Sequence, residues 1–227
     1  MSRFPDLGHW MLQSLSGHFE LEMEDISKDA LLKKNGIVLE TESYKVKKVG
    51  HFCILRMNAL LGIMKMETVV LAATEKDLPL LNLDRISVLG KETQIVELYD
   101  TQLNPWSRAD AYQRLKDQDS NLPDAPRQNR HWYDDILYSC SYHKVGKGIS
   151  QQMTKTAKNY AEAFIADVVA APACDESAKS EKVSQFAENL LSQGGPAVDT
   201  ITKLFGKETA KRLILHHMYG ATNPRRW

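Results

Sequence analysis

The sequence lacks the short motifs that identify many enzymes. It has no G-x-x-x-x-G-K-[ST] loop for nucleotide phosphates, no G-x-G-x-x-G for a dinucleotide, no G-x-S-x-G elbow and no H-E-x-x-H zinc helix. Three cysteines, Cys53, Cys140 and Cys174, are too few for a four-cysteine cluster, and no C-x-x-C is present. The sequence therefore offers no phosphate-binding loop and no cysteine cluster for a metal.

Long apolar runs and an excess of one charge are also missing. The longest nearly apolar run, residues 68–73, is far too short to span a bilayer, and the N-terminal segment has no signal-peptide core. The 29 basic and 29 acidic side chains cancel, which argues against a general nucleic-acid-binding field. Unpaired thiols suit a reducing compartment. We expect a cytoplasmic monomer or weak dimer with no nucleic acid or membrane partner.

The first half of the chain has the pattern of β-strands. Period-two alternation of apolar or aromatic residues marks residues 18–25, 36–42, 47–57, 62–73, 84–89 and 92–99. Gly90 and Lys91 form a short hairpin connection between the last two. Consecutive strands with short links predict an antiparallel meander rather than a parallel sheet.

The second half is different in character. A short helix is expected over 107–116, then a polar, proline-rich stretch up to residue 130 and a strand over 135–144. Helical spacing of apolar residues then predicts helices over 154–171, 180–191, 199–205 and 207–219. We predict a single α+β domain, 1–227, with 1–102 mostly sheet, 103–150 rich in loops and 151–220 helical.

Three features in order along the chain carry a resemblance to a known family. They are the box L-P-L-L-N-L-D at residues 78–84, the D-T-Q at 100–102, and a final helix that begins after the Phe205-Gly206 pair. Together with the strand pattern of residues 36–102, they resemble the ferredoxin-dependent bilin reductases. Red chlorophyll catabolite reductase, in the same superfamily, is an equally fair relative.

The resemblance implies a fold and a reaction. The fold is an α/β/α sandwich, with a central antiparallel meander sheet flanked by helices and a linear tetrapyrrole, biliverdin or a related bilin, held between the sheet and the C-terminal helices. Electrons come singly from ferredoxin, with no bound flavin, metal or nicotinamide. The protein supplies protons in a fixed order to a substrate radical.

Two carboxylates are the candidate proton donors. Asp84 matches the family's central aspartate, and a carboxyl group facing an apolar cleft would have a raised pKa. Its alternative role is a strand-opening residue paired with Arg85. Glu67 stands where the family's biliverdin reducers carry a histidine; it is either a second donor or an exposed partner of Lys65 on a solvated face.

The candidate substrate-binding residues also follow from the resemblance. Leu55 stands where the same enzymes have a pocket glutamate, and Lys144 stands where a family arginine contacts a propionate. Arg127, Arg130 and His131, near the long loop, are further candidates for contacts with the ligand's carboxylates. Lys144 also fits a solvated strand end.

A basic run is the candidate docking face for ferredoxin. It consists of Lys45, Lys47 and Lys48, which would suit an acidic partner. The same run fits a solvated sheet edge that discourages pairing with another sheet.

Three hypotheses of function remain open. The first is ferredoxin-dependent reduction of a linear tetrapyrrole, with Asp84 and Glu67 as proton donors. The second is a protein that binds a bilin or haem without reducing it, which the missing histidine and glutamate favour. The third is an unrelated structural protein, which predicts no cleft between the sheet and the helices.

Overall fold

The computed structural model describes residues 6–118, 121–126 and 130–221. In this part of the chain, eight strands form one sheet in the order β1-β3-β4-β5-β6-β7-β8, with β2 paired to β3 beside β1. Every pair is antiparallel. The strands are β1 (Leu21–Met23), β2 (Leu31–Lys34), β3 (Ile37–Val46), β4 (Gly50–Ala59), β5 (Met64–Ala72), β6 (Leu80–Val88), β7 (Lys91–Tyr99) and β8 (Tyr142–Lys147).

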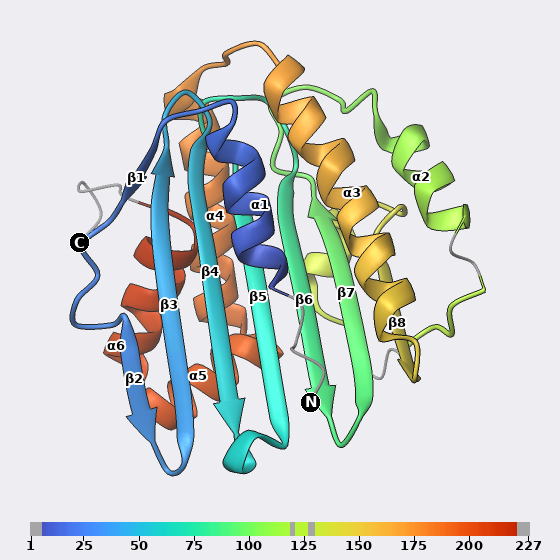
Figure 1. Ribbon diagram of the computed structural model, residues 1–227. Coiled ribbons are helices and arrows are strands. Elements are labelled where there is room, and N and C mark those ends of the chain that lie inside the picture. Colours follow the sequence, from blue (N-terminus) through green and yellow to red (C-terminus); the bar gives the residue numbers. More distant parts are fainter. Residues whose placement is uncertain (1–5, 119–120, 127–129, 222–227) are drawn as a thin grey trace.

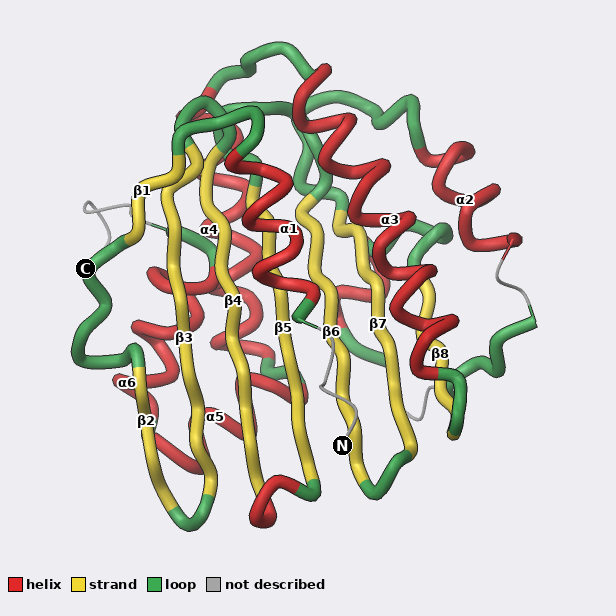
Figure 2. Tube along the Cα trace, viewed as in Figure 1, coloured by secondary structure: helices red, strands yellow, loops and turns green. Residues whose placement is uncertain are grey.

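Helices cover both faces of the sheet, as Figures 1 and 2 show. One layer holds α1 (Leu7–Ser16), α2 (Ala109–Gln118) and α3 (Ser150–Ala170). The other layer holds α4 (Glu176–Gln193), α5 (Pro196–Phe205), α6 (Lys207–Lys211) and the π-helical η3 (Arg212–Met218). The predicted α+β fold with a central meander between helices is confirmed. None of the described helices is long and apolar enough to cross a membrane.

The alternation of side chains along the central strands builds two separate cores. On one face, Phe52, Ile54 and Leu71 pack with residues of α1 and α3 such as Met11 and Phe164. On the other face, Cys53, Leu55, Val70 and Leu80 pack with residues of α4 and η3 such as Leu213. Because neighbouring residues of a strand point to opposite faces, a strand between two helical layers is apolar on both.

Several boundaries differ from the prediction. The strand expected over 135–144 lies at β8 instead, and a short 3-10 helix, η2 (Trp132–Ile136), precedes it. The helix expected over 207–219 divides into α6 and η3. Neither α1 nor β2 was predicted. For α1 the sequence contains one signal, the N-cap Asp6, whose side chain accepts a hydrogen bond from the His9 amide at 3.0 Å.

Candidate functional site

A cavity of about 590 Å³ lies between the sheet and the layer of α4, α5 and η3. Its volume is within the usual range of small-molecule sites. Most of its wall is apolar: Leu39, Leu55, Met57, Met64, Met66, Ile86, Ile95, Leu190, Val198, Ile201, Ile214 and Met218. The structure therefore has the cleft that the third hypothesis excludes, and its wall suits a large apolar ligand.

Asp84 on β6 faces this cavity. Its carboxylate accepts a hydrogen bond from the Thr68 hydroxyl, directly across the β5–β6 ladder, and one from Asn82 Nδ2 at 2.8 Å. Loss of hydration raises the pKa of Asp84 to about 6, and the nearby Glu97 adds to the rise, while the two hydrogen bonds and His143 oppose it. A carboxyl group with this pKa is able to exchange a proton near neutral pH.

A second ionisable pair lies in the same wall. His143 Nε2 on β8 is 2.8 Å from Glu97 Oε1 on β7, and the Tyr99 hydroxyl donates to Glu97 Oε2 at 2.5 Å. The sequence analysis missed this pair. The available signal was Glu97 itself, an acidic residue inside the apolar run of β7. The partner of Glu97 depends on the register of β8, which pairs His143 with Ile95, two residues before Glu97 on β7.

Aromatic rings form one part of the cavity wall. Tyr99, Tyr133 and Tyr219 line it together with Phe186. The ring centroids of Tyr99 and Phe186 are 4.7 Å apart, and those of Phe186 and Tyr219 are 5.4 Å apart. Burial raises the pKa of Tyr219 well above its ordinary value, with Asp84 and Glu97 adding to the rise, so its hydroxyl stays neutral. Such a wall offers flat faces and a hydroxyl to a conjugated ligand.

Glu67 does not reach the cavity, which corrects the expectation of a second donor there. The β5–β6 register pairs Glu67 with Arg85 and Thr68 with Asp84, so Glu67 lies on the opposite face of the sheet. Its carboxylate accepts from the Leu7 amide at 2.9 Å and from Arg56 Nε at 3.1 Å.

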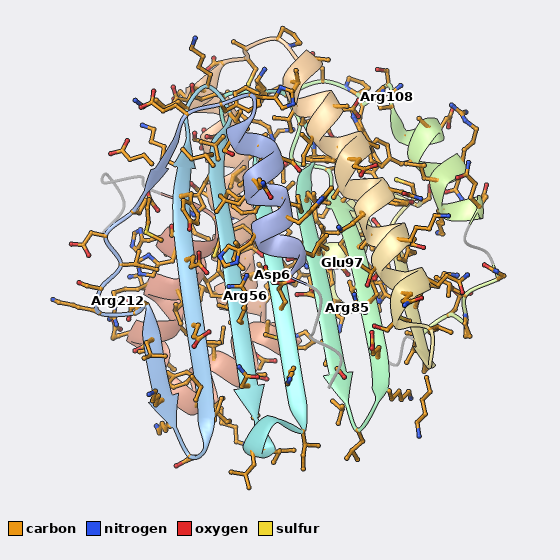
Figure 3. The ribbon with its side chains drawn as sticks, viewed as in Figure 1. Asp6, Arg56, Arg85, Glu97, Arg108 and Arg212 are labelled. Atoms are coloured by element: carbon orange, nitrogen blue, oxygen red, sulfur yellow. The ribbon has the colours of Figure 1, made fainter. Side chains whose placement is uncertain are left out.

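Around Glu67 the structure shows an anchor for α1. Arg56 also bonds Asp6 at 2.8 Å and Glu42 at 2.8 Å, and Figure 3 shows Asp6 and Arg56 together beside the start of this helix. Burial raises the pKa of Glu67, while Arg56 and the Leu7 amide oppose the rise. The sequence also allowed Glu67 to be an exposed partner of Lys65. Glu67 is instead buried and bonded to α1 and Arg56.

The candidate binding residues have different positions. Leu55 lines the cavity. Lys144 is buried but not part of the cavity wall, because its ammonium group donates to the Leu122 carbonyl at 3.0 Å and to Asp124 at 2.7 Å. Arg130 is exposed and paired with Asp135, and it does not line the cavity, although the neighbouring His131 does. Arg127 lies outside the described residues.

The basic run of β3 and its turn lies apart from the cavity wall. Lys45 and Lys48 are exposed, and Lys47 Nζ is 2.5 Å from Glu20. Within the described ranges, no group of three or more His, Cys, Asp or Glu side chains is arranged to hold a metal ion.

Comparison with solved structures shows a likeness of fold. No family model matches the sequence, and no curated protein matches it. Among solved structures, selenomethionine-labelled phytochromobilin synthase from tomato, in complex with biliverdin, aligns with a TM-score of 0.78 and 14% sequence identity. The alignment covers 95% of this chain and 82% of that one. The chain therefore shares the fold of a protein whose structure holds biliverdin.

Proposed function

We propose that this chain binds a linear tetrapyrrole in the cavity and reduces it with electrons from ferredoxin. The observation that carries the proposal is Asp84, a carboxyl group with a pKa raised to about 6 in the wall of an otherwise apolar cavity. The likeness to a biliverdin-bound reductase fold supports the choice of ligand. The apolar lining of the cavity, between the sheet and the helices of the other wall, suits the conjugated pyrrole rings of such a ligand.

Two-electron reduction of a bilin consumes two electrons and two protons. Ferredoxin delivers one electron at a time, so the substrate passes through a radical. In the proposed mechanism Asp84 gives a proton to a pyrrole nitrogen or lactam oxygen, which makes the conjugated system easier to reduce. The Thr68 hydroxyl and Asn82 amide then stabilise the resulting carboxylate by hydrogen bonding.

The second proton needs another source in the wall. His143 is the group of suitable chemistry, because an imidazole can carry and transfer a proton and this one lies in the cavity wall, paired with Glu97. With Glu67 on the other face, the pair of donors in this proposal is Asp84 and His143.

A non-catalytic bilin or haem carrier is the second candidate. One observation favours it. Where the resembling enzymes use a glutamate, the cavity wall has Leu55, and Glu67, which stands in place of their histidine, does not line the cavity. The two functions share the cavity and differ in what happens after binding.

Anaerobic turnover separates them. The protein is mixed with biliverdin, reduced ferredoxin and ferredoxin reductase, and the absorption spectrum is followed. The reductase proposal predicts loss of the biliverdin bands with wild type and with Glu67→Gln, whose carboxylate lies outside the cavity, but not with Asp84→Asn. A bound spectrum that stays unchanged in the wild type would establish the carrier, and equal rates for all three proteins would exclude Asp84 as donor.

A further inference from the structure

One end of the sheet carries an unusual set of exposed apolar side chains. The turn between β4 and β5, which includes the 3-10 helix η1 (Leu60–Gly62), and the turn between β6 and β7 lie at this end, together with the β2–β3 turn (Figure 1). Leu60, Leu61, Ile63 and Leu89 are 62, 100, 48 and 75% exposed. These four residues are hereafter the apolar tips.

Three of these residues have backbone conformations that leucine rarely adopts. The φ angles of Leu60, Leu61 and Leu89 are 52°, 56° and 52°, in the left-handed region. Glycine or asparagine would occupy such positions at lower cost. These three leucines are strained and mostly exposed and lie outside both core clusters, so the observation points to a role outside the folded chain.

The same end is strongly basic in a chain with no net charge. Residues 33–37, 58–65, 85–92 and 146–150 contain six basic side chains and one acidic side chain. The acidic residue, Glu92, is 2.5 Å from the buried Arg85. The other five basic residues are Lys33, Lys34, Lys65, Lys91 and Lys147, and all of them except Lys65 are exposed.

We propose that this end of the sheet docks peripherally on an anionic lipid bilayer, with the apolar tips in the interface and the lysines at the lipid phosphates. The projecting leucines suit the apolar region below the lipid headgroups, and the flanking lysines suit the negative charge of the headgroups themselves. Ile63 adjoins Met64, which lines the cavity, so the docked end would bring the cavity wall close to the bilayer. The proposal does not depend on the ligand of the cavity.

Co-sedimentation of the full chain with lipid vesicles tests the docking. We expect binding to vesicles of phosphatidylcholine with phosphatidylserine and little binding to phosphatidylcholine alone. The double variant Leu61→Ser, Leu89→Ser should lower the partition coefficient at least about tenfold. Its matched control, Met23→Ser with Val169→Ser, removes two exposed apolar side chains from other parts of the surface and should leave binding unchanged.

A second pair of variants tests the charge. Lys34→Gln with Lys91→Gln should weaken binding roughly tenfold or more, whereas Lys45→Gln with Lys48→Gln makes the same charge change at the β3–β4 turn and should not. Unchanged melting temperatures would show that the exposed substitutions leave the fold intact. Absence of anionic-vesicle binding by the wild type would overturn the proposal. Binding that depends on the lysines but not on the leucines would also overturn it, because it would show electrostatic adsorption without insertion of the apolar tips.

Discussion

Thr68 and Asp84 face each other across the β5–β6 ladder, and the Thr68 hydroxyl donates a hydrogen bond to the Asp84 carboxylate. This contact stabilises the charged form of a carboxyl group that burial otherwise keeps protonated. The pKa of Asp84, about 6, is thus a balance between the apolar wall and two donors, Thr68 and Asn82. A mutation in the apolar wall or in either donor should therefore change the pKa of Asp84.

Removing the Thr68 hydroxyl should raise the pKa of Asp84 further. Thr68→Val keeps the shape of the side chain but takes a donor from the carboxylate, so the neutral acid persists to higher pH. If Asp84 is the proton donor, the alkaline limb of the pH profile of bilin reduction moves upward in this variant. Thr200→Val, which changes a threonine elsewhere in the cavity wall, should leave the profile in place. Coincident profiles for wild type and Thr68→Val would contradict the assignment.

The raised pKa also predicts how stability depends on pH. Because the folded-state pKa, about 6, is above the ordinary value of 3.8, the folded protein binds the Asp84 proton more tightly than the unfolded chain. The resulting stabilisation is complete below about pH 4 and is lost as the pH rises through 6. Relative to Asp84→Asn, the wild type should lose about 3 kcal/mol of unfolding free energy between pH 4 and 7. Urea denaturation of both proteins across this range measures the difference; a constant difference would refute the shift.

His143→Gln tests the second donor. The substitution keeps a polar side chain beside Glu97 but removes the group that exchanges a proton. We expect single-turnover reduction to slow by about 10²-fold or more, with little change in biliverdin affinity. Glu97→Gln removes the carboxylate that pairs with His143 and should slow the reaction less. A normal rate for His143→Gln would remove this residue from the mechanism.

Glu67 should matter for stability rather than for the reaction. Glu67→Ala leaves the Leu7 amide and Arg56 Nε without this acceptor in a buried position, and should cost about 3 kcal/mol. Glu67→Gln retains an acceptor oxygen and should cost less. Both variants should reduce biliverdin at the wild-type rate per folded molecule, as thermal denaturation and turnover together can show. A specific loss of turnover in Glu67→Gln would return this residue to the site.

Much of the fold was predictable because its signals are local. Alternation along β3 to β7 and the helical spacing of α3 and α4 come from contacts within each element and one neighbouring layer. Asp84 was predictable from the resemblance of its box, and its raised pKa from the apolar cleft that the resemblance implied.

The positions of the remaining site residues depend on how the strands pair, and no local pattern in the sequence determines that register. A shift of one residue turns a strand's side chains to the other face, and the β5–β6 pairing places Thr68, not Glu67, beside Asp84. Lys144 is likewise on the face away from the cavity, whereas its neighbour His143 reaches Glu97. Proximity of Glu97 and His143 is a contact between residues 46 apart, and no local pattern contains it.

Spectral titration measures directly whether biliverdin binds in the cavity. Ala197 lies on α5, is exposed and lines the cavity, whereas Lys203 is exposed on the same helix and does not line it. We expect a saturable shift of the biliverdin spectrum with wild type and Lys203→Trp. Ala197→Trp, whose indole fills the cavity, should lose at least about tenfold in affinity. No spectral shift with wild type, or equal affinity for all three proteins, would contradict binding in the cavity.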